Sequence, residues 1–110
     1  MGASTTGVRG TSQFGMNLKA NTVTTSTPAI GTEVAPASNT TNYRGQALVG
    51  YNTVDNFKFV TTNSVANSGD AVLGGSDAQI FTVSYIVNVP GSQPAGTYTT
   101  TLTYICTPTF

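Results

Sequence analysis

Between Phe81 and Val89 the chain alternates apolar and polar side chains with a period of two residues, and this pattern constrains the fold more than any other. The odd positions hold Phe, Val, Tyr, Val and Val, whereas the even positions hold Thr, Ser, Ile and Asn. Successive side chains of a β-strand point to opposite faces of the sheet. The pattern therefore predicts a strand whose odd face is buried.

A second strand is predicted directly after it. Residues 90–96 contain two prolines and two glycines, which interrupt a strand, and the alternation resumes from Thr97 to Cys106. Its odd positions are four threonines and Ile105, which we expect to face solvent. We expect the even positions to face inward: Tyr98, Thr100, Leu102, Tyr104 and Cys106.

Shorter segments with strand-like sequences precede this pair. They comprise a strand at 13–20, a β-branched continuation or edge at 22–27, a hairpin of 46–51 with 57–60, and short strands at 32–35 and 71–73. Threonine, which favours the outer face of a sheet, fills 21 positions, while only 7% of residues are charged. We predict an all-β fold, a single immunoglobulin-like β-sandwich of about 6–8 antiparallel strands.

The length of 110 residues corresponds to one domain. Residues 1–12 hold a single branched apolar side chain, Val8, among serine, threonine and glycine. With nothing to anchor them to a core, they are predicted to form a flexible N-terminal arm. Residues 13–110 are predicted to form the β-sandwich domain.

Several classes of function are excluded by composition. The chain has no histidine, so serine-triad hydrolysis, zinc hydrolysis and haem ligation through histidine lack their usual residue. Four Lys and Arg balance four Asp and Glu, which argues against nucleic-acid binding because a phosphate backbone requires a basic patch. No apolar stretch approaches the length of a membrane span. We predict a protein that is not an enzyme, has no cofactor or metal and does not insert into a membrane.

Three residues are candidates for contacts with other molecules. Tyr43 and Tyr51 lie outside the last two predicted strands and could stack on a sugar, although core packing explains the other tyrosines better. Cys106 is the only cysteine. It is either a small hydrophobic residue of the core or, in an oxidising compartment, half of a disulfide to a partner outside the chain.

The few charged residues suggest no further site. The acids Glu33, Asp55, Asp70 and Asp77 could ligate calcium, but Asp70 and Asp77 lack the dense spacing of a calcium loop, so we interpret the aspartates as turn residues. Lys58 stands between two phenylalanines in a predicted strand. We expect it to point to solvent, and an intramolecular bond between lysine and asparagine is the less favoured alternative.

The C-terminal part of the chain resembles a known group of domains. Residues 83–90, followed by Pro94-Ala95-Gly96-Thr97-Tyr98 and a threonine-rich strand, are similar to the ending of secreted bacterial β-sandwich domains. This ending, around residues 80–106, is shared by WxL-type cell-wall-binding domains and by pilin-like domains. The resemblance implies a bacterial protein that is secreted or located at the cell surface. Met1 begins no recognisable signal peptide, so the chain is either cytosolic or, in the interpretation we favour, a piece of a longer exported protein.

We therefore expect a structural or adhesive domain of a bacterial cell-surface or extracellular protein. Self-association through strand edges, as in a pilus or filament, is the most specific form of this hypothesis. Because residues 1–12 lack large apolar side chains, residues 13–19 would have to act as the inserted strand. The alternative is a module that binds cell-wall glycan or another polysaccharide through loops at one end of the sandwich.

Overall fold

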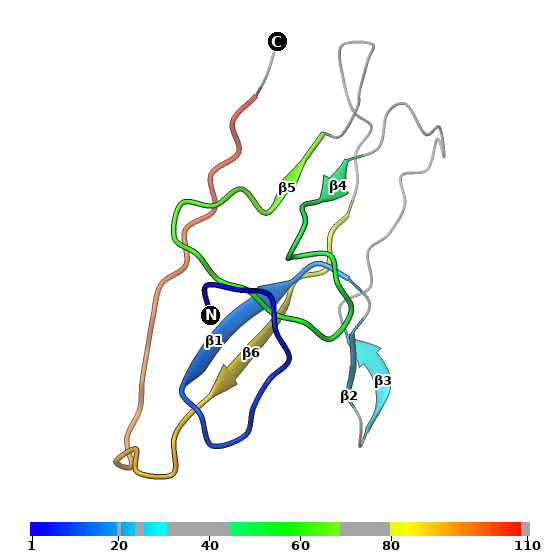
Figure 1. Cartoon of the computed structure of the whole chain (residues 1–110). Helices are drawn as coiled ribbons and strands as arrows, with labels where there is room; N and C mark the ends of the chain where they lie inside the picture. Colours follow the sequence, from blue (N-terminus) through cyan, green and yellow to red (C-terminus); the bar gives the residue numbers. More distant parts are fainter. Residues whose placement is uncertain (20, 24–25, 31–44, 69–79, 109–110) are drawn as a thin grey trace.

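The computed structural model describes residues 1–19, 21–23, 26–30, 45–68 and 80–108, and these contain strands but no helix. The strands are Gln13–Asn17 (β1), Asn21–Val23 (β2), Ser26–Ile30 (β3), Gln46–Ala47 (β4), Ala66–Asn67 (β5) and Ser84–Asn88 (β6). In this part of the chain they form three two-stranded antiparallel sheets, β1 with β6, β2 with β3, and β4 with β5 (Figure 1). The prediction of an all-β fold is confirmed.

β1 lies in the middle of the main sheet and is hydrogen-bonded on both edges. On one edge it pairs with β6, from Gln13 opposite Asn88 to Asn17 opposite Ser84. On the other edge, the backbone N–H of Met16 donates to the carbonyl of Lys58 at 2.9 Å, and the N–H of Lys58 donates back at 3.1 Å. The strand predicted at 13–20 is thus confirmed over 13–17.

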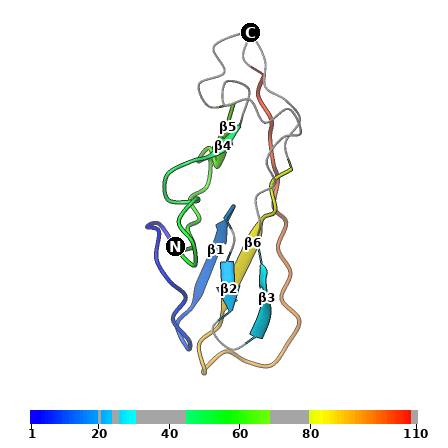
Figure 2. The same cartoon turned by 90° about the vertical axis from the view of Figure 1, so that its right-hand side faces the viewer.

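The first residues of the chain are bound to this sheet. Thr5 and Phe57 exchange two backbone hydrogen bonds of 3.1 and 2.8 Å, and the N–H of Phe59 donates to the carbonyl of Met1 at 2.7 Å. The segment around residue 58 therefore lies between β1 and the N-terminal residues (Figure 2). This differs from the expectation that residues 1–12 have no anchor, because backbone hydrogen bonds to a sheet edge do not require large apolar side chains.

The core lies where β1 meets β4 and the loop that follows it. The N–H of Leu18 donates to the carbonyl of Tyr51 at 2.8 Å, which fixes that loop against the end of β1. Phe14 packs edge-on against Phe59, with ring centroids 4.9 Å apart. The buried apolar residues are Met16, Leu18, Ala47 and Tyr51, against which Phe59, Val65, Ala66, Phe81 and Val83 pack.

The predicted hairpin of 46–51 with 57–60 is wrong. β4 pairs instead with β5, and residues 57 and 58 bridge to Thr5 and Met16. Within 46–51 only 46–47 form a strand, because the N–H of Tyr51 donates to the carbonyl of Leu48 and closes a turn. The pairing partners of both segments are set by distant residues that sequence spacing does not reveal. Of the range 22–27, residues 22–23 belong to β2 and residues 26–27 to β3, and these two strands pair antiparallel. The strands predicted at 32–35 and 71–73 lie outside the described residues.

The buried face of β6 is the opposite of the predicted one. Ser84 is buried and Ile86 is half-buried, while Tyr85 and Val87 on the odd face are exposed. The reason lies in the first residues of the chain: Gly7 packs so closely on the Ile86 side chain that a Cβ at this position would overlap it. The N-terminal residues therefore cover the even face of β6. The odd positions are half-buried only before the strand, at residues 81 and 83.

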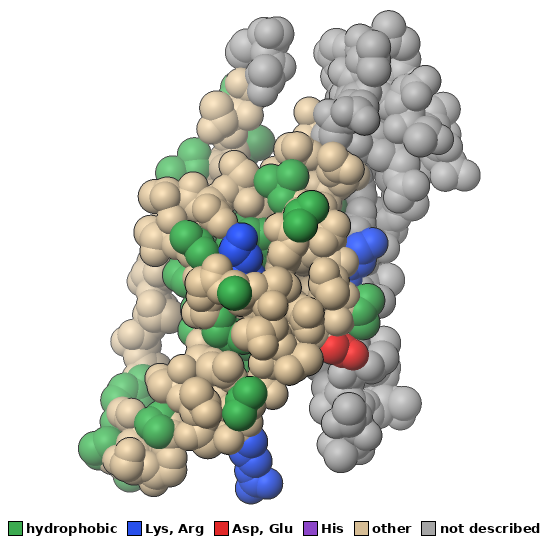
Figure 3. Space-filling view, in the orientation of Figure 1, with side chains coloured by type: hydrophobic (Ala, Val, Ile, Leu, Met, Phe, Trp, Pro, Cys, Tyr) green, Lys and Arg blue, Asp and Glu red, His purple; other side chains and the backbone are tan. Residues whose placement is uncertain are grey.

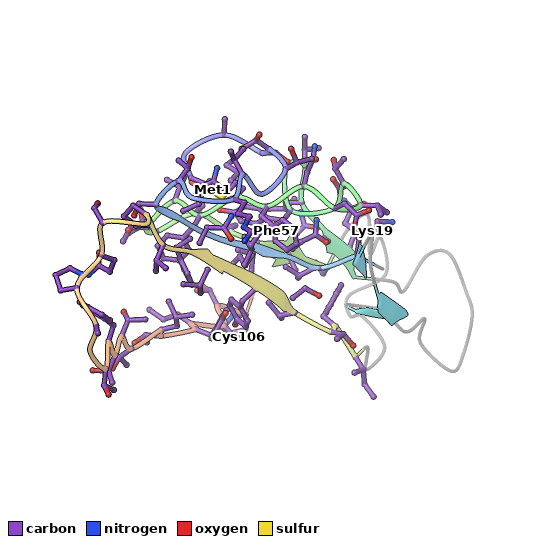
Figure 4. All side chains as sticks on the ribbon, turned by 90° about the horizontal axis from the view of Figure 1, so that it is seen from below. Met1, Lys19, Phe57 and Cys106 are labelled. Atoms are coloured by element: carbon purple, nitrogen blue, oxygen red, sulfur yellow. The ribbon has the colours of Figure 1, made fainter. Side chains whose placement is uncertain are left out.

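Residues 97–108, called here the C-terminal segment, form no strand in the structure. The segment lies on the side of β6 away from the N-terminal residues (Figure 4). Of its described side chains Leu102 is half-buried and the others are exposed. No backbone hydrogen bond joins it to the other residues that the structure describes. The prediction of a strand at 97–106 is wrong, because the segment lies over the sheet and pairs with no strand that the structure describes.

Candidate functional site

Large exposed apolar side chains are concentrated on β6 and on the chain that follows it. Tyr85 is 45% exposed, Val87 67% and Val89 58%. These three residues, called here the β6 apolar row, occupy alternate positions along β6 and the first residue after it. The C-terminal segment adds Tyr98, Tyr104 and Ile105, each more than half exposed. Figure 3 shows hydrophobic side chains reaching the surface at the lower left, where the chain leaves β6.

The outer edge of β6 also exposes backbone hydrogen-bonding groups. Met16 uses its N–H and C=O to bind Lys58, so the pair of Met16 with Tyr85 is a non-hydrogen-bonded pair of the antiparallel ladder. The N–H and C=O of Tyr85, and by alternation those of Val87, consequently point away from β1. No strand in the described part of the chain pairs with this edge.

The C-terminal segment contacts the rest of the chain through two tyrosines. The hydroxyl of Tyr98 donates to the carbonyl of Pro94 at 2.8 Å, and its ring lies next to Gly96. The hydroxyl of Tyr104 is hydrogen-bonded to that of Tyr85. Burial, followed by this hydrogen bond, raises the pKa of Tyr104 from 10.0 to about 12. The contact of Tyr104 with Tyr85 therefore joins the segment to β6, while Tyr98 binds the loop that precedes the segment.

Of the two tyrosines predicted to contact a ligand, Tyr51 is buried in the core with 1% of its surface exposed. Its ring packs beneath the ammonium group of Lys58, whose Nζ lies 5.2 Å from the ring centroid. It offers no free face for a sugar, which corrects the prediction, and Lys58 is half-buried rather than directed to solvent. Tyr43 lies outside the described residues.

Cys106 is exposed and has a free thiol, so its predicted burial is wrong: the C-terminal segment does not turn its even face into a core. The disulfide of Cys106 to an outside partner stays a prediction. Asp55 adopts a turn with a φ of 58°, which confirms its interpretation as a turn residue. The other three acids, Glu33, Asp70 and Asp77, lie outside the described residues.

The sequence analysis missed Asn17, the most buried polar residue that the structure describes. Its Nδ2 donates to the carbonyls of Thr53 and Asn56, both at 2.5 Å, and its Oδ1 accepts from the N–H of Lys19 at 2.6 Å. The side chain thus fixes the loop that delivers residues 57–59 to the edge of β1. The sequence gives no signal for this, because a polar residue between Met16 and Leu18 fits the alternation of a strand with a solvent face.

Comparisons with models of protein families, with curated proteins and with solved structures find no match for this chain. Among the described residues, no three of His, Cys, Asp or Glu gather closely enough to hold a metal ion. The same residues include no helix with the length and hydropathy needed to cross a membrane. The β6 apolar row, the outer edge of β6 and the C-terminal segment are therefore the features on which a function can be argued.

Proposed function

We propose that the chain is a non-enzymatic structural or adhesive domain of a bacterial cell-surface or extracellular protein, and that it self-associates through strand edges. The observation that carries this proposal is the outer edge of β6, where the backbone groups of Tyr85 and Val87 have no strand partner among the described residues and lie beside an exposed apolar row. An exposed strand edge with apolar side chains is a template for pairing with another chain.

The residues of this edge support a function in pairing. Proteins usually protect an edge strand with charged residues or proline, and β6, with the sequence Ser-Tyr-Ile-Val-Asn, has neither. The chain has a net charge of zero, so no long-range repulsion separates two copies. A protein that avoids aggregation while keeping such an edge uses the edge for a specific contact.

We further propose that the complete fold is an immunoglobulin-like β-sandwich of about 6–8 antiparallel strands. The main sheet and the C-terminal segment lie in two layers with side chains between them, as in a sandwich (Figure 4). The location at the cell surface is supported by the low fraction of charged residues and by the resemblance of residues 80–106 to the ending of secreted domains.

Light scattering on a sizing column, over a hundredfold range of concentration with reductant present, tests self-association. We expect the mass to rise with concentration above 11.3 kDa, and electron microscopy to show linear particles at the highest concentration. Cys106→Ser is the control, because it removes the exposed thiol and leaves strand edges intact. A mass that stays at 11.3 kDa at every concentration would contradict the proposal.

A cell-wall or polysaccharide-binding module is the second candidate, and one observation favours it. Tyr98 is 62% exposed and Tyr104 55% exposed, so both offer ring area to a sugar. Sedimentation with purified peptidoglycan measures this directly. If the module binds glycan, Tyr98→Ala lowers the bound fraction severalfold, whereas Tyr51→Phe, in the core, leaves it unchanged.

A further inference from the structure

We propose that residues 97–106 of one copy pair with the outer edge of β6 in a second copy, so that the chain assembles head to tail by donating its C-terminal strand. This inference rests on the proposed self-association and names the donor, the acceptor and the partner, which is a second copy of this chain. Each step below is argued from the described residues.

The acceptor is already built as a strand edge. β1 holds β6 in extended conformation along five paired residues. The outward N–H and C=O groups of Tyr85 and Val87 lie at the spacing that an added strand uses. Their side chains belong to the exposed β6 apolar row. A donor strand with apolar residues at alternate positions would bury those side chains against this row.

The donor has the matching features. Residues 97–106 place Tyr98, Leu102 and Tyr104 at even positions, with threonine at most odd ones. The segment is extended, yet no backbone hydrogen bond joins it to the rest of the described chain. Pairing with β6 of another copy would satisfy unpaired backbone groups on both partners at once.

The loop between β6 and the donor favours a second copy over pairing with β6 of the same chain. In residues 90–96, a turn closes where Gln93 N–H donates to the carbonyl of Pro90 at 3.0 Å. Tyr98 then packs on Gly96 and binds the carbonyl of Pro94, which directs the segment over the face of the sheet instead of along its edge (Figure 2). The outer edge of β6 is left for another molecule.

The structure also argues against the donor strand expected from the sequence, residues 13–19. Residues 13–19 would have to leave both β6 and Lys58 to act as an inserted strand, because β1 is bonded on both edges. The C-terminal segment breaks no backbone pairing in the described structure when it moves. Since donor and acceptor are different surfaces, the contact is heterologous, and it extends into a filament unless the geometry closes a ring.

Complementation between two defective variants tests this arrangement. The donor-defective variant carries Thr100→Pro and Thr101→Pro, which remove one backbone N–H directed to each edge of the segment. The acceptor-defective variant carries Val87→Pro, which removes an N–H directed away from β1 and therefore spares the β1 pairing. The matched control for the donor carries Thr100→Val and Thr101→Val, and the control for the acceptor carries Val87→Thr. Both controls keep every backbone N–H.

We expect each proline variant alone to stay at 11.3 kDa while the controls assemble like the unmodified chain. Mixing the two proline variants should give a particle of twice that mass that grows no further, because one functional donor meets one functional acceptor. If the proline variants still assemble alone, another edge mediates assembly, and this inference fails while the proposed function stands. If the unmodified chain does not assemble, both fail.

A competitor makes the test independent of whether Val87→Pro folds. A synthetic peptide of residues 97–106, with serine in place of cysteine, should cap acceptor edges and lower the mean mass of the unmodified chain in a dose-dependent manner. The same peptide with proline at positions 100 and 101 should have no effect. Equal effects of the two peptides, or no effect of either, would overturn the inference.

Discussion

β1 and the C-terminal segment carry the same alternating pattern but have different structures. β1 is bonded on both edges, and its Met16 is 3% exposed, whereas the C-terminal segment has no described backbone partner and its Tyr104 is 55% exposed. Alternation shows that a segment can form a half-buried strand. Whether it does so depends on a neighbour with free backbone groups, which β1 finds in β6 and residue 58.

The largest expected difference between the two regions is in side-chain truncation. Leu18→Ala, at a site 2% exposed, should lower the free energy of unfolding by about 2–5 kcal/mol because it removes core contacts and leaves a cavity. Leu102→Ala, in the C-terminal segment, should cost less than about 1 kcal/mol. Urea unfolding at low protein concentration measures both, and equal losses would break the comparison.

The next largest effect should come from the Asn17 clamp, the hydrogen bonds from the Asn17 side chain to the carbonyls of Thr53 and Asn56. Asn17→Ala leaves the carbonyls of Thr53 and Asn56 without this donor in a partly buried site, which we expect to cost about 2–3 kcal/mol. Asn63→Ala, on an exposed side chain, is the control and should stay within about 0.5 kcal/mol of the unmodified chain. Urea unfolding again gives the values. A loss for Asn17→Ala no greater than for its control would show that the clamp is not needed.

Two glycines provide a smaller and more local contrast. A Cβ at Gly15 would come within 2.7 Å of the Cβ of Phe57 and 3.0 Å of the Met1 sulfur, so Gly15→Ala should cost about 1–2 kcal/mol. At Gly91, in the loop before the C-terminal segment, a Cβ would meet nothing within 4 Å. Thermal unfolding should therefore be unchanged by Gly91→Ala. A neutral Gly15→Ala would mean that residues 57–59 do not pack against β1 in solution.

The smallest effect concerns the contact between β6 and the C-terminal segment. The raised pKa of Tyr104 means that the folded chain favours the neutral phenol, so this contact is fully stabilising below pH 10 and is lost as the pH rises from 10 towards 12. Tyr85→Phe removes the hydrogen-bond partner and should move the pKa of Tyr104 part of the way back to 10.0, since burial remains. Tyrosinate absorbance measures the titration. An unchanged titration curve in this variant would show that the two hydroxyls do not meet.

The sequence predicted the fold class and several segments, but it did not predict which segments pair. The alternation around Met16 predicted β1 correctly because Met16 and Leu18 lie on one buried face, although Asn17 on the other face is buried as well. It gave the wrong buried face for β6, since Gly7 and its neighbours, 79 residues before Ile86, cover the even side. Periodicity is a local property, whereas pairing and burial depend on residues far away in the chain.

The candidate site was predictable only in part for the same reason. The sequence predicts a strand edge available for assembly, with residues 13–19 as the donor strand. Nothing in the sequence shows that β1 is hydrogen-bonded on both edges. Tyr51 was chosen as a surface aromatic for its position outside the best strands, and the hydrogen bond from Leu18 N–H to its carbonyl draws it into the core. Asn17 showed no motif, since its function depends on the loop it binds.

The pairing of β1 with β6 also has a consequence for the order in which the chain folds. Gln13 and Asn88 are 75 residues apart, so β1 has no partner on that edge until most of the chain is available. At about 5–20 residues per second, a ribosome needs roughly 4–15 seconds to make that stretch. Folds that depend on such distant contacts form in milliseconds to seconds. During synthesis β1 therefore waits with an open edge, and chaperones that bind extended apolar segments have time to reach it.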